Sequence, residues 1–308
     1  MGLGQLEVEF LLNEHRYRPI AGEVLTIGRQ AIELTQERTI DLLKSYGIGL
    51  LTASFDLDKT NKHHSSTDKW ITDHSLFKSF SDCRLYSADL SAYEGADFVF
   101  NVCDEVPDEL VGRFDFVIDG GSLDNVFDPA RMLRNMSRML KPGGRAFTFA
   151  WSNSYASAYL KITPDWIMDY YAANEFADCK VYVAKHPSVK KDENVLAIWH
   201  FDPAMKNFQD VGAVRALKVL ARPDRPAHVE DEGRLQTFCI AEKGDNSTND
   251  RVPVQWQYRL SSQPYRTSIS RFRSSPRPIF ASPTSNRGHI RLPPISSHGT
   301  LSPVAVWG

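Results

Sequence analysis

The stretch from residue 113 to 149, RFDFVIDGGSLDNVFDPARMLRNMSRMLKPGGRAFTF, leaves few choices of fold. Two apolar runs flank a segment that begins after one pair of glycines and ends at another. In that segment, residues 128–144, methionines and leucines recur at helical spacing behind Asp128, which suits an N-cap, and Pro129, which suits a first helical turn. A strand, a crossover helix and a second strand in this order are typical of a parallel sheet.

The alternation of strand-like and helix-like patterns continues on both sides of this unit. We predict strands at 22–28, 83–91, 96–102, 114–121, 145–151, 179–184 and 194–201, and helices at 35–47, 128–144 and 163–176. Strands that alternate with helices indicate an α/β fold with a mostly parallel sheet. The polar stretch 53–80 interrupts the alternation, and we interpret it as an inserted lid with apolar anchors.

Charge is unevenly distributed along the chain. The whole sequence has 36 basic and 38 acidic residues and a net charge of -2, so no overall field favours nucleic acid or an anionic membrane. No acidic residue follows Asp250, whereas eight arginines follow it among many serines and prolines. Such a composition offers little apolar surface to bury, so we predict a disordered tail over 262–308 and interpret it as a solvated linker.

The predicted organisation is one main domain with an extension at each end. It comprises an N-terminal extension at 1–20, the domain at 21–203 with its insert at 53–80, a C-terminal extension at 204–261 that packs on the domain, and the tail at 262–308. The four cysteines show no C-x-x-C spacing. The sequence also has no secretory signal and no long apolar run, so we expect a cytoplasmic protein that is not anchored in a membrane. The oligomeric state stays open.

Ligands of an open parallel sheet bind outside the carboxyl ends of the strands. The candidate binding residues at these ends are Gly28, Arg29, Gln30, Asp89, Leu90, Ser91, Asn101, Val102, Asp119, Gly120 and Gly121. Asp89 closes the second strand and is able to accept hydrogen bonds from both hydroxyls of a ribose, while Asn101 closes the third and is able to bind an adenine edge. Gly120 and Gly121 would let a ligand approach the backbone closely. Turn formation explains Asp89 or Asn101 equally well when each is taken singly. Together they predict a nucleoside-type site.

Residues 20–202 resemble the class I methyltransferases that use S-adenosylmethionine. The likeness rests on the series of strand, DGGSLDNVFD, helix and LKPGG. It is nearest to a group of uncharacterised methyltransferase-like proteins with an L-G-R-Q first loop and D-x-S-x-Y-E-G-A-D at the second strand, here TIGRQ (26–30) and DLSAYEGAD (89–97). The resemblance implies a Rossmann-like seven-stranded sheet, mostly parallel with an antiparallel last strand and flanked by helices. It also implies S-adenosyl-L-methionine as the cofactor.

The first loop departs from the family pattern. Several glycines usually stand there, but this chain keeps only Gly28. We consider that Arg29 compensates by pairing its guanidinium with the cofactor carboxylate, because bidentate charge-assisted hydrogen bonds are strong. The alternative is an exposed arginine in a loop.

The two segments expected to face the methyl acceptor also depart from the family pattern. Similar proteins carry E-H-V after the fourth strand, where this chain has Asp124 and Asn125 before a valine. Asp124 is then the candidate proton acceptor and Asn125 a candidate for positioning the acceptor, with a cap or turn as the alternative for Asp124. In place of H-G-F-Y after the fifth strand, Tyr155 and Tyr159 are expected to face the acceptor.

Two classes of function remain open. One is a methyltransferase that acts on a small-molecule or saccharide-like acceptor, which the surviving strand-end residues favour. The other is a methyltransferase-like protein that binds a ligand or partner without turnover. A nicotinamide-dependent reductase is disfavoured because no G-x-G-x-x-G follows the first strand. We expect no metal, since the spacing of Asp58, His63, His64, Asp68, Asp73 and His74 matches no closed site.

Overall fold

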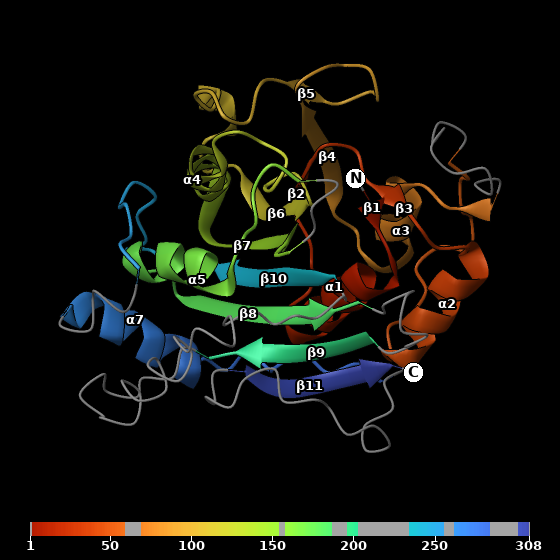
Figure 1. The fold of residues 1–308 in the computed structure, drawn as a ribbon. Coiled ribbons are helices and arrows are strands. Elements are labelled where there is room, and N and C mark those ends of the chain that lie inside the picture. The colour runs from red at the N-terminus through yellow and green to blue at the C-terminus, as the bar shows by residue number, and fades with distance from the viewer. Residues whose placement is uncertain are drawn as a thin grey trace.

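The computed structural model describes residues 2–58, 69–153, 158–186, 196–202, 234–255 and 262–283, and the backbone of 301–307. The strands of its main sheet are β2 (Glu23–Ile27), β4 (Arg84–Asp89), β5 (Phe98–Val99), β6 (Phe114–Gly120), β7 (Leu140–Trp151), β8 (Asp178–Lys185), β9 (Leu196–Phe201), β10 (Leu235–Glu242) and β11 (Leu301–Trp307). These nine strands follow the order β11-β9-β8-β10-β7-β6-β2-β4-β5 (Figure 1). A small parallel pair, β1 (Gly2–Leu3) and β3 (Ala31–Ile32), lies apart from them.

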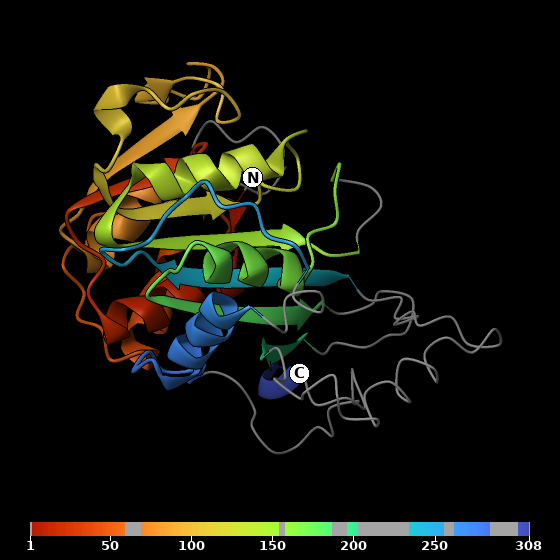
Figure 2. The same cartoon turned by 90° about the vertical axis from the view of Figure 1, so that its left-hand side faces the viewer.

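Helices cover both faces of the sheet. They are α1 (Gln5–Tyr17), α2 (Gln36–Ser45), α3 (Asp73–Phe80), α4 (Pro129–Met139), α5 (Pro164–Ala173) and α7 (Gln263–Ser274), with a short 3-10 helix at Asp108–Leu110. Apolar residues of α4, α5 and α7 join one core, and those of α1, α2 and α3 join the other. Figure 2 shows α4, α5 and α7 in front of the sheet, in yellow-green, green and blue.

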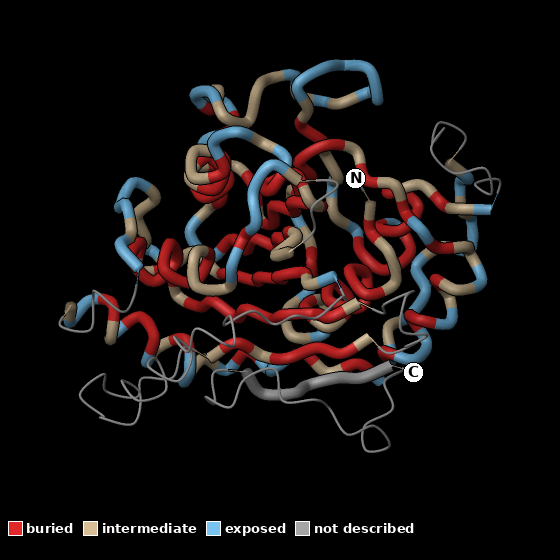
Figure 3. The backbone as a smooth tube through the Cα atoms, viewed as in Figure 1, coloured by how far each residue is buried: buried red, intermediate tan, exposed pale blue. Residues whose placement is uncertain are grey.

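The two cores arise from the period of two along the buried strands. In β6, Val117 points into the core under α4, whereas Phe116 and Ile118 point into the core under α1. Figure 3 shows the central strands buried along most of their length. Strands that are covered on both faces are apolar almost throughout, which is why the sequence pattern identified them.

The predicted α/β class with a mostly parallel sheet is confirmed. The ladders from β7 through β6 and β2 to β4 and β5 are all parallel. On the other side, β10 lies between β7 and β8 and is antiparallel to both. The predicted domain boundary at 203 is therefore wrong, since β10 at 235–242 is an integral strand of the sheet. The strand expected at 194–201, β9, is found further out, antiparallel to β8.

The predicted disordered tail, 262–308, is also wrong for residues 262–283 and for 301–307, which form β11 at the edge of the sheet. Tyr265, Ile269 and Phe272 lie on one side of α7 and are buried against the core. Beyond the helix, Phe280 stacks on Phe10 of α1 with ring centroids 4.0 Å apart. The few apolar residues of this region suffice for packing because they share one helical face. Residues 284–300 lie outside the described residues.

The N-terminal extension and the insert contribute to the core too. Helix α1 buries Phe10, Leu11 and Leu12, so residues 1–20 are not a mere extension. In the insert, Ile71, before α3, and Leu76, within α3, are fully buried, as expected of its apolar anchors. Residues 59–68 lie outside the described residues, so the lid stays a prediction. No helix in the described parts of the chain combines the length and apolar composition needed to cross a membrane.

Candidate functional site

The carboxyl ends of β2, β4, β5 and β6 meet at one edge of the sheet. β2 pairs in parallel with both β4 and β6, so the residues that follow these three strands are neighbours. Gly28 follows β2 with a φ of 73°, and Gly121 follows β6 with a φ of 92°. Both conformations are left-handed and favour glycine, so the backbone here turns sharply without side chains in the way.

Asp89 ends β4 at this edge and is half-buried. One carboxylate oxygen, Oδ1, accepts the N–H of Leu90 at 2.6 Å. Among the described residues, none donates a hydrogen bond to its other oxygen. Leu90 and Ser91, the next two candidates, are exposed. The carboxylate is thus fixed by its own loop and keeps one oxygen for a hydroxyl or amide donor.

Asn101 forms the turn that follows β5. Its Oδ1 accepts the N–H of Cys103 at 3.0 Å, and its backbone carbonyl accepts the N–H of Asp104 at 2.8 Å. No described residue accepts a hydrogen bond from its Nδ2. The carbonyl of Val102 accepts a hydrogen bond from Asn135 of α4 at 2.7 Å. Asn101 is therefore a turn former, and the part of its amide that remains open is a donor.

Arg29 is already paired within the chain. Its guanidinium binds Asp73 of α3 through two hydrogen bonds, Nε to Oδ2 at 2.8 Å and Nη2 to Oδ1 at 2.6 Å. The hydrogen bond to Asp73 also raises the pKa of Arg29 above its usual value. The expected pairing with a cofactor carboxylate is not what the structure shows, because α3 of the insert supplies the carboxylate.

Gln30 fills the space beside the first loop. It is buried, and its Nε2 donates to the carbonyls of Ile27 at 2.9 Å and Gly28 at 3.0 Å. Its Oε1 is buried without a hydrogen-bond partner. A Cβ added at Gly120 would lie 1.8 Å from this oxygen. The Gln30 amide thus occupies the space that a side chain at Gly120, the last residue of β6, would need.

Gly120→Ala is expected to destabilise the protein by about 1–3 kcal/mol, because the added methyl group overlaps the Gln30 amide and forces it to shift. The loss should be much smaller when the same change is made in a Gln30→Ala background. Urea unfolding of the wild type, both single variants and the double variant measures this coupling. An equal loss in both backgrounds would show that the overlap is not the cause.

Asp119 holds the loop after β6 from inside the protein. Its side chain is fully buried and accepts the N–H of Ser122 at 2.7 Å and that of Leu123 at 3.3 Å. Burial raises the pKa of this carboxyl to about 7, with a further contribution from the nearby Asp124. The side chain has no access to a ligand, so it shapes the glycine turn instead of binding the cofactor directly.

Asp124, like Asp119, holds a loop from inside the protein. It is fully buried, and its Oδ2 accepts the N–H of Trp151 at 2.7 Å while its Oδ1 accepts Nδ2 of Asn125 at 3.0 Å. Burial raises its pKa to about 6. Its backbone carbonyl accepts the N–H of Tyr159, whose side chain is exposed. The structure thus assigns Asp124 to the junction of two loops, without the access that its predicted catalytic role needs. Tyr155 lies outside the described residues.

A cavity of about 680 Å³ adjoins this edge, with Gly120 and Gly121 in its wall. Its other walls include Glu7 of α1, Glu33 after β3, Phe149 and Trp151 of β7, His186 after β8 and Arg234 before β10. Of the predicted residues, Asn125 also lines it. The sequence carries no local signal for this set, because the residues come together only through the order of the strands.

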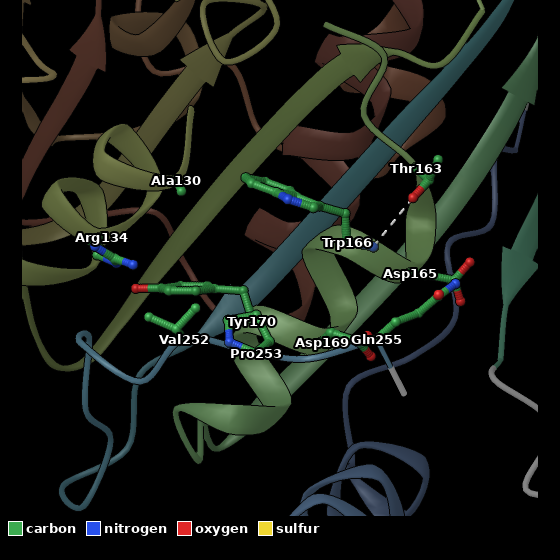
Figure 4. Close-up of a pocket in the computed structure, with 10 residues that line it drawn as sticks. All are labelled: Ala130, Arg134, Thr163, Asp165, Trp166, Asp169, Tyr170, Val252, Pro253 and Gln255. Carbon is green, nitrogen blue, oxygen red and sulfur yellow. Dashed lines mark hydrogen bonds between the residues drawn. The ribbon is translucent and has the colours of Figure 1, made fainter. Parts of the chain in front are cut away.

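A second cavity, of about 300 Å³, lies between α4 and α5 (Figure 4). In this view the Tyr170 ring extends toward Arg134, and Val252 lies beside it. None of the residues that line this cavity belongs to the strand-end set. The larger cavity beside Gly120 is therefore the candidate for the reaction site.

Residues 85–148 match a family model described as a methyltransferase domain, and no curated protein matches the chain. Among similar solved structures, phosphoethanolamine N-methyltransferase 2 of Haemonchus contortus, bound to phosphomonomethylethanolamine and S-adenosylhomocysteine, is 12% identical with a TM-score of 0.37 over 78% of this chain and 54% of that one. This chain thus spans about half of that protein. A Thermotoga maritima methyltransferase, described as a possible histamine N-methyltransferase, is 12% identical with a TM-score of 0.34 over 78% of this chain and 95% of that one.

The match to the family model runs from β4 through the glycine turn and α4 into β7. It covers the same unit that the sequence pattern singled out. The closer likeness to proteins with an L-G-R-Q first loop stays a prediction. Over residues 85–148 the chain is similar to a methyltransferase domain, set in an α/β fold of the Rossmann-like type.

Proposed function

We propose that this protein is an S-adenosylmethionine-dependent methyltransferase that acts on a small molecule. The observation that carries the proposal is the place of Asp89, whose open carboxylate oxygen stands at the strand edge next to the left-handed turn at Gly28. Its strand, β4, opens the segment that matches a methyltransferase domain. The cavity beside Gly120 provides the space for an acceptor at the same edge.

The described residues fit the nucleoside part of the cofactor. Asp89 has an oxygen available for the ribose hydroxyls, and Asn101 has an amide donor available for the adenine. The turns at Gly28 and Gly121 bring backbone close to a ligand without side-chain bulk. Arg29 does not belong to this set, because Asp73 occupies its guanidinium.

When bound, the cofactor supplies a methyl group on a positively charged sulfur. The protein's own contribution is to place an acceptor nucleophile in line with that methyl group, since alignment accounts for much of the acceleration in such transfers. Gly120 and Gly121 form a wall of the larger cavity at the carboxyl end of β6, the strand next to β2. This wall is where an acceptor in the cavity would meet the cofactor.

Asp89→Ala should weaken the binding of S-adenosylhomocysteine by about 1.5–3 kcal/mol, the scale of hydrogen bonds to a charged group. Isothermal titration calorimetry on the full chain measures the change. Asp108→Ala is the matched control, because Asp108 is an exposed aspartate of the 3-10 helix that makes no part of the strand edge. Unchanged affinity in a folded Asp89→Ala protein would remove Asp89 from the site.

Turnover is tested separately from binding. The protein is incubated with cofactor labelled on its methyl group and a mixed metabolite extract, and label in the small-molecule fraction is followed. We expect transfer that depends on Asp89. Binding of S-adenosylhomocysteine with no transfer to any acceptor would favour a protein that binds without catalysis.

A further inference from the structure

We propose that the cavity beside Gly120 binds a small amine, and that Glu7 takes the proton that the amine nitrogen must lose before it is methylated. The proposal rests on the methyltransferase function above, which supplies the sulfonium methyl donor. It narrows the acceptor class expected from the sequence to an amine, and it replaces Asp124 with Glu7 as the proton acceptor.

The fold places two carboxyl groups in the wall of this cavity. Glu7 stands in the first turn of α1, where its Oε2 accepts the N–H of Gly4 at 3.0 Å. Glu33 follows β3, and its N–H donates to the carbonyl of Leu3 at 3.0 Å. The pairing of β1 with β3 therefore holds the two glutamates side by side at the cavity.

Glu7 has the environment of a proton acceptor. Its side chain is buried, and burial raises the pKa of the carboxyl to about 7, while the charge of Glu33 raises it further and the hydrogen bond from Gly4 lowers it. A general base is most effective when its pKa lies near the working pH. Glu7 lines the cavity, whereas Asp124, the acceptor predicted from the sequence, does not.

The other charged groups of the cavity do not cancel this carboxyl pair. Arg234, which precedes β10, lies over the Trp151 ring with its guanidinium carbon 5.0 Å from the centroid. Burial lowers the pKa of His186, which follows β8, and so disfavours its charged form. Two carboxyl groups against one guanidinium favour a cationic ligand and disfavour an anionic one.

The remaining walls combine apolar and aromatic side chains with the amides of Gln5, Asn125 and Gln236. Leu6, Phe149, Trp151 and Leu196 line the cavity together with the glutamates. Aromatic faces attract an ammonium group, and apolar walls accept a hydrocarbon substituent. A small amine with an apolar body matches this combination of negative charge and aromatic surface.

The proposed reaction involves only the Glu7 carboxylate, the amine and the methyl donor. The carboxylate of Glu7 takes one proton from the incoming ammonium, which frees the lone pair of the nitrogen. The nitrogen then forms a bond to the donor methyl carbon, while the bond between that carbon and sulfur breaks and its electron pair stays on sulfur. The product leaves as a methylated ammonium, and Glu7 returns its proton to solvent.

The test uses the full chain saturated with S-adenosylhomocysteine and three probes of nearly equal size, benzylamine, benzyl alcohol and benzoate, titrated by calorimetry at pH 8. We expect benzylamine to bind at least about tenfold more tightly than the other two. Glu33→Gln should weaken benzylamine about fivefold or more and leave the affinity for S-adenosylhomocysteine unchanged. Glu109→Gln, a change at an exposed glutamate outside the cavity, should alter neither.

The pH dependence tests Glu7 itself. Because its carboxyl ionises near pH 7, benzylamine should bind more tightly as the pH is raised from 6 to 8, and Glu7→Gln should abolish this trend. With labelled cofactor, methyl transfer to benzylamine should follow the same pH profile and fall at least about tenfold in Glu7→Gln.

Three outcomes would overturn the proposal. Benzyl alcohol or benzoate could bind as tightly as benzylamine, which would refute a cationic acceptor. Glu7→Gln could instead weaken S-adenosylhomocysteine, which would place Glu7 at the amino group of the donor. The wild-type pH profile could persist in Glu7→Gln, which would exclude Glu7 as the proton acceptor. If the wild type fails to bind S-adenosylhomocysteine at all, the proposed function fails first, and benzylamine binding to the protein alone is then measured by itself.

Discussion

A chain that ends at residue 261 should not fold cooperatively. It lacks α7 and the segment 275–283, whose side chains Tyr265, Ile269, Phe272 and Phe280 are buried. Burying an apolar side chain of this size contributes about 1.5–3 kcal/mol, so the four together contribute roughly 6–12 kcal/mol before the entropy of ordering is subtracted. A typical domain is stable by only about 5–15 kcal/mol, which leaves the shortened chain little or no margin.

The contacts of α7 are specific as well as apolar. The hydroxyl of Tyr265 donates to Oδ1 of Asp169 in α5 at 2.7 Å, so truncation would also leave a buried carboxyl without this partner. Phe280 closes a cluster of rings around Phe10 on the opposite face of the sheet. Residues 262–283 thus contribute to the cores on both faces.

Thermal unfolding followed by circular dichroism compares the full chain with the chain that ends at 261. The matched control ends at 283, which keeps α7 and the segment after it and, like the shorter chain, lacks the edge strand β11. We expect a cooperative transition in the control and none, or one at least about 10 °C lower, in the shorter chain. A normal transition in the shorter chain would show that α7 is not part of the core.

The sequence allowed the central elements to be predicted because their signals are local. The helices predicted over 35–47 and 163–176 begin behind Thr35 and Thr163, and each threonine accepts a backbone N–H from three residues further along, at 3.2 Å and 3.4 Å. Asp128 caps α4 in the same way at 2.9 Å. Periodicity and capping are encoded within one turn of the chain, so they can be read without knowledge of the fold.

The remaining features depend on residues that are distant in the sequence. Asp73 reaches Arg29 across 44 positions, and β10 enters the sheet beside a strand that ends 84 positions earlier, at Trp151. No composition or spacing rule predicts either contact. Residues 262–283 were wrongly predicted to be disordered for a related reason. They include few apolar residues, and nothing in the local sequence indicates which carboxylates their arginines contact. The strand-end residues were found together, whereas the carboxyl pair of the larger cavity was not.

Arg277 forms buried ion pairs that the composition of this region did not predict. Its guanidinium is buried and lies between carboxylates of three elements, Glu14 of α1, Asp178 of β8 at 2.6 Å and Glu242 of β10 at 2.7 Å. Burial lowers the pKa of this guanidinium, but Glu14 and Asp178 outweigh burial and raise it above its usual value. The carbon of the guanidinium also lies 4.8 Å from the ring centroid of Tyr17. One cation thus joins the first helix to two central strands.

Arg277→Ala should destabilise the protein by about 3–5 kcal/mol, because removing one partner of a buried ion pair leaves the others buried and uncompensated. Arg277→Lys should recover only part of this loss, since an ammonium cannot reproduce the planar fork that contacts several carboxylates at once. The control is Arg273→Ala, in the same segment, whose pair with Asp202 is more than a third exposed at both side chains. An exposed pair contributes about 0–1 kcal/mol, so urea unfolding should separate the two variants by several kcal/mol. Equal small losses would mean that the carboxylates around Arg277 are compensated by other groups.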